Sequence, residues 1–172
     1  MVCYAHREKL RRAPPGKDDI PMNRSTAREI AVHLAFMLAF SSESAEELLA
    51  RELTPESFAL RAKDEPLYAE FPGEGELAYI TRLTRGVGGH GAELDGYIEK
   101  YAKGWRFSRI DRVASAIMRV TMFEILYMPD VPNKVAINEA VEIGKKYLDD
   151  DVVKFINGIL GSFVRSELPE QG

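Results

Sequence analysis

Lysines and aromatic residues alternate near the C-terminal end of the chain, a combination that can bind nucleic acid. Lys145, Lys146 and Lys154 bracket three aspartates, with Tyr147 and Phe155 interleaved. On single-stranded RNA, an aromatic ring can stack on an unpaired base while a lysine contacts phosphate. The alternative is a pair of core aromatics beside solvated lysines, and these residues by themselves favour that alternative.

A second basic candidate lies near the start of the first expected helix. Arg24 and Arg28 are four residues apart, so on a helix they project from one side. Backbone N–H groups at a helix start add partial positive charge, which suits a phosphate. Ordinary solvated arginines are the alternative, and spacing alone does not separate the two.

A glycine-rich run resembles a nucleotide-binding motif only in its letters. Residues 86–91 read G-x-G-x-x-G, but helical periodicity continues on both sides and no strand precedes them. A G-K-[ST] pattern is also missing, which argues against a phosphate loop. We therefore predict a weakened or closely packed stretch of helix here.

No group of residues assembles a catalytic, metal or cofactor site. His6, His33 and His90 show no local metal-ligand spacing, so we expect them at the surface. Glu124 lies in an otherwise apolar segment, where a structural salt bridge explains it more readily than catalysis. Arg112 and Arg119 are its candidate partners. We expect a protein that is not an enzyme and uses no cofactor.

Charge is distributed unevenly along the 172 residues, so the net charge of −4 argues only weakly against nucleic acid. Residues 1–28 carry seven lysines and arginines against three acids, whereas residues 43–76 carry ten acids against three bases. Such asymmetry allows a basic surface on an acidic protein.

The setting that these residues favour is a reducing cytoplasm. Cys3 is the only cysteine, which excludes an internal disulfide. No stretch reaches the roughly 18–20 apolar residues of a membrane-spanning helix, and the first residues lack the apolar part of a secretory signal. We expect a cytoplasmic protein without a membrane segment.

Apolar periodicity predicts an all-α protein, a compact bundle of about seven helices. Residues 112–128 are apolar almost all round and so belong in the middle of the bundle. The segments that we expect to be helical are 26–40, 44–53, a short helix from 54, 76–101 (as one helix or two in tandem), 112–128, 134–148 and 152–165. Residues 1–21 are expected to be a flexible basic arm, 22–166 the helical domain, and 167–172 a short tail.

Polar residues at the expected helix starts support these boundaries. Thr26 with Glu29, and Ser44 with Glu47, have the spacing of capping boxes, in which each side chain satisfies a backbone N–H. Thr54 precedes a proline, which suits an N-cap followed by a first-turn proline.

One long segment resembles the NusB family. Residues 129–143 read PDVPNKVAINEAVEI, similar to the signature P-D-[IV]-P-x-K-V-A-I-N-E-A-[VI]-E-[LI] of that family. Lys145-Lys146-Tyr147 and the run 154–160 follow at the family spacing, and residues 112–126 resemble the family's central helix. The match is strong from about residue 95 onward, whereas residues 1–21 and roughly 54–75 lie outside the pattern.

The resemblance implies a bacterial transcription antitermination protein that binds RNA and a protein partner. Family members pair with NusE, a small-subunit ribosomal protein, and bind the single-stranded boxA element of ribosomal transcripts. They then help the RNA polymerase elongation complex, with other Nus factors, read through terminators. The RNA-binding residues carried over by position are Arg24, Arg28, Lys146, Tyr147, Asp151, Lys154, Phe155 and Asn157. The expected face for NusE includes Val113, Ala114, Ile117 and Glu124.

The chain departs from the family at its first helix and leaves rival functions open. Family members often have a run of arginines where this chain has Ser25, which removes one expected phosphate contact. A protein-interaction module without RNA binding is one rival. An RNA-modifying enzyme is another, although it would need a further α/β domain of about 150 residues. A homodimer formed through an apolar partner face is also possible.

Overall fold

The computed structural model describes residues 22–169, and this part of the chain is helical throughout, without a strand. The all-α prediction is therefore confirmed. The eight α-helices are α1 (Arg24–Phe40), α2 (Ala45–Glu52), α3 (Pro55–Arg61), α4 (Glu74–Gly89), α5 (Gly91–Tyr101), α6 (Arg112–Tyr127), α7 (Asn133–Tyr147) and α8 (Asp150–Glu167). Two short 3-10 helices cover Pro66–Tyr68 and Phe107–Arg109. The predicted arm over 1–21, and residues 170–172 of the predicted tail, lie outside the described residues.

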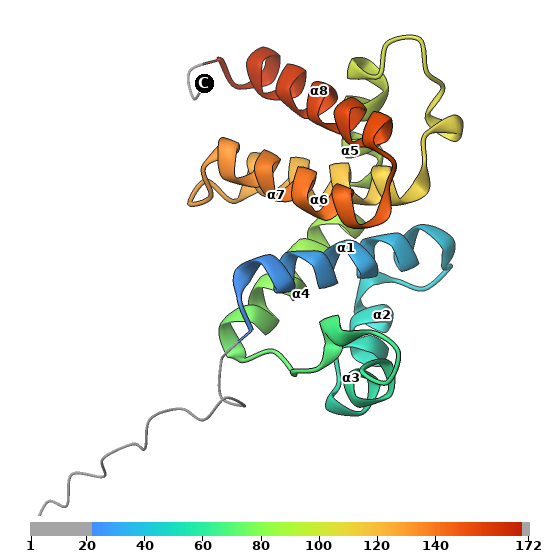
Figure 1. The fold of residues 1–172 in the computed structure, drawn as a ribbon, viewed down its shortest axis with the longest axis vertical. Helices are drawn as coiled ribbons and strands as arrows, with labels where there is room; N and C mark the ends of the chain where they lie inside the picture. Colours follow the sequence, from blue (N-terminus) through green and yellow to red (C-terminus); the bar gives the residue numbers. More distant parts are fainter. Residues whose placement is uncertain (1–21, 170–172) are drawn as a thin grey trace, which may run out of the picture.

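Helix α6 lies at the centre of the bundle, as its apolar sequence predicts. It packs against α1, α4, α5, α7 and α8. Figure 1 shows the helices α1 to α4 in the lower half of the molecule and α5 to α8 in the upper half. Helices α1 and α7 start on the same side of the view, while α8 runs back above α7.

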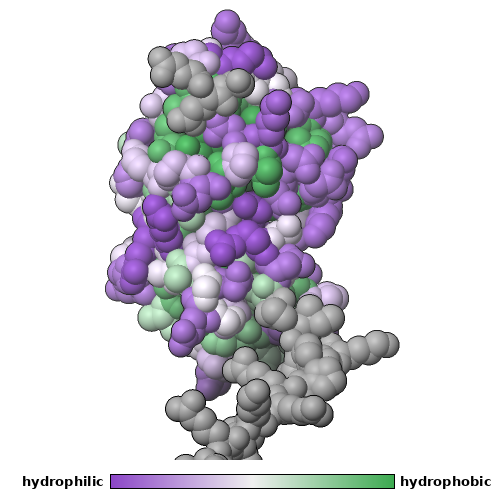
Figure 2. All heavy atoms as spheres, turned by 90° about the vertical axis from the view of Figure 1, so that its left-hand side faces the viewer, coloured by the Kyte–Doolittle hydropathy of each residue, from purple (hydrophilic) through white to green (hydrophobic). Residues whose placement is uncertain are grey.

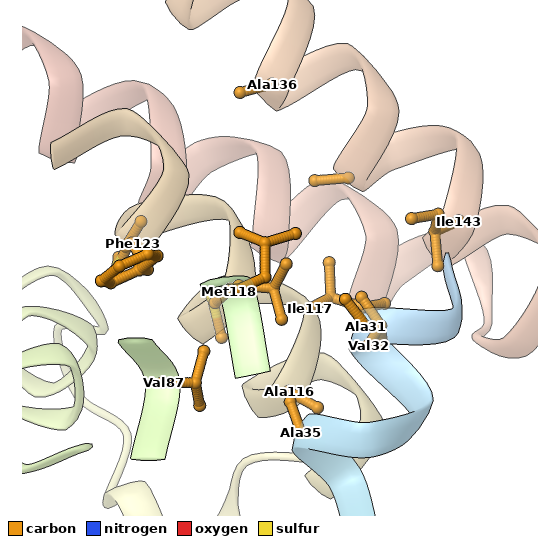
Figure 3. Packing of buried hydrophobic residues seen from close by; sticks show 14 of the residues in the cluster. Ala31, Val32, Ala35, Val87, Ala116, Ile117, Met118, Phe123, Ala136 and Ile143 are labelled. Carbon is orange, nitrogen blue, oxygen red and sulfur yellow. The ribbon is translucent and has the colours of Figure 1, made fainter. Parts of the chain in front are cut away.

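Small residues let α1 and α6 approach closely. Ala31 and Ala35 of α1 are fully or almost fully buried, and in Figure 3 they face the segment of α6 that carries Ala116 and Ile117. Close packing of this kind maximises the apolar surface removed from water. The face in Figure 2, where α7 begins and α8 ends, is mainly hydrophilic with apolar patches between polar side chains.

Two of the three predicted helix caps are confirmed and one is wrong. The Ser44–Glu47 capping box is present, and Thr54 accepts a hydrogen bond from the Ser57 N–H. Helix α1, however, begins two residues before Thr26, because the side chain of Asn23 accepts from the Thr26 N–H at 2.8 Å. The carboxylate expected in that box is buried and has other partners.

The predicted segment 76–101 forms two helices, which explains why there are eight helices where about seven were expected. Helix α4 ends at Gly89 and α5 begins at Gly91. Gly86 is closely packed as well, since a Cβ atom there would lie 2.1 Å from the ring of Phe123. The glycine-rich run is thus a helix break and a packing contact, as its helical context predicts.

No helix within residues 22–169 combines the length and the apolar character that crossing a membrane requires.

Candidate nucleic-acid interface

The guanidinium of Arg28 lies in the core, which corrects its expected place on an RNA-binding surface. Its Nε and Nη2 atoms donate to the two carboxylate oxygens of Glu124 at 3.0 and 3.2 Å. A third nitrogen lies 3.2 Å from Glu139. The side chains of Arg28 and Glu124 are 4% and 0% exposed. The guanidinium of this arginine is therefore paired with two carboxylates, of which Glu124 is buried and Glu139 is partly exposed.

Electrostatics favour the ionised arginine despite its burial. Desolvation by burial works against the charged guanidinium, but the hydrogen bond and attraction to Glu124 outweigh it and raise the pKa of Arg28. Tyr79 also donates to Glu124, and burial raises the pKa of that hydroxyl. The prediction of a salt bridge at Glu124 holds, but its arginine comes from α1.

The two arginines expected to pair with Glu124 lie elsewhere. Arg119 pairs with Asp95, with its Nε 2.6 Å from a carboxylate oxygen. Arg112 places its guanidinium carbon 4.4 Å from the centre of the Phe40 ring.

Arg24 is the exposed arginine at the start of α1, and it already has partners. Its side chain is 51% exposed and lies 3.5 Å from Glu76. Its guanidinium carbon sits 4.1 Å from the centre of the Tyr79 ring. Ser25, where the family often has another arginine, donates to Glu139 at 3.0 Å. This helix start therefore offers a phosphate one accessible positive charge, not two.

Lys146 and Tyr147 lie at the seam between α7 and α1, held by the buried carboxylate of Glu29. The Lys146 ammonium and the Tyr147 hydroxyl each lie 2.5 Å from one oxygen of that carboxylate. The aromatic ring stays accessible, since Tyr147 is 40% exposed. Tyr147 is therefore neither a fully buried core residue nor a mobile surface residue. Its ring has a defined position and an open face.

His33 belongs to the same hydrogen-bond chain and is only partly exposed, contrary to the expected surface histidine. Its Nε2 lies 2.8 Å from the Tyr147 hydroxyl, and its Nδ1 lies 2.9 Å from the Tyr68 hydroxyl. A carboxylate can only accept, so the Tyr147 hydroxyl donates to Glu29 and its oxygen accepts a hydrogen bond from the Nε2–H of His33. The Tyr68 hydroxyl then donates to Nδ1.

Burial shifts the pKa values of the histidine and the two tyrosines in this hydrogen-bond chain. It lowers the pKa of His33, which favours the neutral ring that the hydrogen bonds require. It also raises the pKa of Tyr68 to about 12. Burial, followed by the hydrogen bond to Glu29, raises the pKa of Tyr147 as well. The two phenols therefore stay protonated at neutral pH.

A basic groove runs between α7 and α8 and contains two of the predicted RNA-binding residues, Lys154 and Asn157. Its volume is about 550 Å³. The residues that line it are Lys134, Ile137, Asn138, Val141, Lys145, Asp150, Val153, Lys154 and Asn157. Three lysines face one aspartate, with two amides and an apolar floor between them. Such a groove can hold a phosphate backbone and contact base edges at the same time.

Asp151 and Phe155 lie on the other side of α8, in a smaller pocket of about 230 Å³. Trp105 and Arg109 line this pocket too, and neither was predicted to have a function. The sequence signal that could have indicated them is the set of basic residues around the single tryptophan in residues 103–109 (KGWRFSR). Lys134 and Asn138 of the groove lie within the family signature, but their types alone assign them no role.

The residues expected to face NusE are mostly inside the protein. Ala114, Ile117 and Glu124 are each 0% exposed, so in this structure they support the core and offer no contact surface. Val113 is partly exposed and lines a hollow of about 430 Å³ together with Arg61 of α3, Tyr147 of α7 and several residues of α1. Any docking face in this region must therefore use Val113 and its exposed neighbours. Contact with NusE itself stays a prediction.

Within residues 22–169, no cluster of three or more His, Cys, Asp and Glu side chains has the arrangement of a metal site. The hydrogen-bonded groups described above are ion pairs and a chain through His33, and they hold side chains in position.

Similarity to known proteins covers most of the chain. Residues 25–165 match the profile of the NusB family. The transcription antitermination protein NusB of Acetivibrio thermocellus is 39% identical over 147 residues, which span 86% of this chain and 92% of that protein. The protein of the same name from Clostridium kluyveri is 33% identical over 152 residues, 85% of this chain and 97% of that protein. A solved structure of NusB from T. maritima superimposes with a TM-score of 0.71 at 25% identity, covering 86% of this chain and 94% of that one.

Proposed function

The chain belongs to the NusB family of transcription antitermination proteins, and from this premise we propose that it is a non-catalytic factor that binds RNA with a protein partner. The proposed RNA is the single-stranded boxA element of nascent ribosomal transcripts, and the proposed partner is NusE. In the bacterial cytoplasm this assembly joins the RNA polymerase elongation complex and other Nus factors, and it promotes reading through terminators.

The basic groove between α7 and α8 is the observation that carries this proposal. Lys134, Lys145 and Lys154 line it at positions where phosphates of an extended strand can bind. The amides of Asn138 and Asn157 offer both donors and acceptors to base edges. Lysines supply affinity that does not depend on sequence, whereas the amides select bases.

The lysines of this groove remain available to a ligand. The salt bridge from Lys145 to Glu142 joins two side chains that are each 56% exposed, and exposed pairs of this kind contribute at most about 1 kcal/mol. Binding of RNA can therefore replace it at little cost.

Tyr147 supplies a further stacking surface, at the seam between α7 and α1. Its hydrogen bonds to Glu29 and His33 fix the ring before RNA arrives, and a ring that is already ordered loses less conformational entropy on binding. The buried Arg28 takes no part in RNA contact under this proposal.

The test is a titration of fluorescently labelled boxA RNA, followed by anisotropy with and without NusE at several salt concentrations. The Lys154→Gln change removes one groove charge, so it should weaken binding and lower the salt dependence of log K by about 0.7. Lys63→Gln is the matched control, because Lys63 is an exposed lysine that does not line the groove. Equal affinity of all three proteins would refute the groove assignment, and no binding with NusE present would favour a pure protein-interaction module.

A further inference from the structure

Trp105, the single tryptophan of the chain, is exposed on the segment between α5 and α6. Its relative exposure is 58%. The segment turns tightly before it: Gly104 has a φ of 83°, and the Trp105 N–H donates to the carbonyl of Ala102 at 3.1 Å. The indole is therefore held at the surface by its backbone, although exposing so large an apolar ring costs free energy.

A second aromatic ring lies against this indole. The ring centroids of Trp105 and Phe155 are 5.7 Å apart, with an interplanar angle of 61°. In Figure 1 the segment between α5 and α6 lies next to the start of α8, which brings the two rings together. Both rings line the pocket of about 230 Å³ on the outer side of α8.

Three basic side chains flank Trp105 in the chain, and one of them, Arg109, lines the pocket together with the aspartates Asp111 and Asp151. Lys103, Arg106 and Arg109 are exposed, and within residues 22–169 none of them forms a salt bridge. The nearby carboxylate of Asp111 is occupied as the N-cap of α6, since it accepts from the backbone N–H of Val113 at 2.8 Å. An exposed aromatic ring beside basic side chains that form no salt bridge is typical of surfaces that bind single-stranded nucleic acid.

The pocket and the basic groove lie on two sides of α8. Lys154 lines the groove, whereas its neighbour Phe155 lines the pocket. The two sites therefore share α8 as a common wall. The pocket is smaller than the roughly 300 Å³ at which sites for drug-sized ligands begin, so its size suits one planar base. Asp151, also on its wall, can accept from a base amino group.

We propose that Trp105 and Phe155 form a second base-binding site, in which an unpaired RNA base stacks on the indole while Arg106 and Arg109 contact the flanking phosphates. The strand then runs from the basic groove over α8 to this pocket. This inference rests on the proposed RNA-binding function and extends the expected RNA path to a segment outside the family signature.

The single tryptophan makes the site directly observable, because stacking of a base on an indole quenches its fluorescence. The full chain is titrated with a single-stranded RNA of about 16 nucleotides carrying boxA at its centre. Anisotropy of the labelled RNA is followed in parallel. We expect quenching that saturates at the same RNA concentration as the anisotropy. A second titration includes NusE. There the Trp105→Phe variant, which has no tryptophan, measures the fluorescence that does not come from Trp105.

Variants separate stacking from charge. Trp105→Ala should weaken RNA binding about tenfold, within the range for loss of one base–aromatic stack, and Trp105→Phe should restore most of that loss. Replacing Arg106 and Arg109 by glutamine should lower the salt dependence of log K by about 1.4 for two lost phosphate contacts. Leu60→Ala is the control, because Leu60 is an exposed apolar residue on α3.

Three results would overturn the inference, and they are distinguishable. Anisotropy that shows binding, with Trp105 fluorescence and the affinity of Trp105→Ala unchanged, would remove the second site and leave the proposed function standing. Quenching by NusE alone, with RNA affinity unaffected in Trp105→Ala, would assign the surface to protein contact. If no RNA binds even with NusE present, both this site and the proposed function fail.

Discussion

Replacing Arg28 by methionine should lower the free energy of unfolding by about 3–5 kcal/mol, the usual cost of removing one partner of a buried ion pair. Three features of the Arg28–Glu124 pair indicate that the loss will be this large. The carboxylate of Glu124 is 0% exposed, so water cannot replace the arginine. The arginine contacts both of its oxygens, and Tyr79 supplies only one further donor. Since domains are stable by about 5–15 kcal/mol, the variant loses a large fraction of its stability.

Urea unfolding followed by circular dichroism measures this loss. The double change Arg28→Met with Glu124→Gln removes both buried charges and keeps an amide oxygen for Tyr79. It should therefore be more stable than the sum of the two single changes predicts, with a coupling energy of about 0.5–3 kcal/mol. Arg24→Met, four residues earlier on the same helix, is the matched control and should cost at most about 1 kcal/mol, because Arg24 is half exposed.

The RNA affinity of the folded fraction decides between the two possible roles of Arg28. A stability within about 1 kcal/mol of the unaltered chain, together with a large loss of RNA affinity, would refute the buried ion pair and restore Arg28 as a phosphate contact. We expect the reverse result, a strong loss of stability with RNA affinity preserved.

Further changes test the packing, the histidine chain and a helix cap, each by urea unfolding. Gly86→Ala should destabilise the fold by about 1–3 kcal/mol because its Cβ would overlap the Phe123 ring, whereas Gly96→Ala, in open space on α5, should stabilise it by about 0.5–1 kcal/mol; the same sign for both would contradict this packing. Burial lowers the pKa of His33 below its ordinary 6.5, so the unfolded chain takes up this proton first. The stability that the neutral His33 contributes to the folded protein is therefore fully present above about pH 6.5. It is lost as the pH falls through the lowered pKa of the folded state. His33→Gln should flatten the fall in stability below that pH, and an unchanged slope would exclude His33. Ser44→Ala removes a capping box and should cost about 1 kcal/mol, while no change would mean that the cap is already satisfied by water.

Much of the fold follows from local sequence patterns, since those patterns act over a few residues. The apolar run of α6 places it in the centre, and Ser44 and Thr54 mark helix starts through contacts three residues away. The cap at Asn23 was missed because Thr26 with Glu29 has equally good spacing, and only the bundle shows that this glutamate bonds to α7.

The candidate site was less predictable, because its residues meet across long separations in the chain. Arg24 and Arg28 look alike in sequence, but Glu124, which lies 96 residues after Arg28, draws only the second arginine into the core. Exposure is also a property of the whole fold. The accessible indole of Trp105 and the buried side chain of Ile117 could not be told apart by hydrophobicity.

The most direct test of the central claim is native mass spectrometry of the full chain mixed with NusE and boxA RNA, with a scrambled RNA of the same length as the reference. The proposed function predicts a complex with one copy of each component, and little retention of the scrambled strand. A chain that pairs with NusE but retains neither RNA, or that retains both RNAs equally, would contradict it.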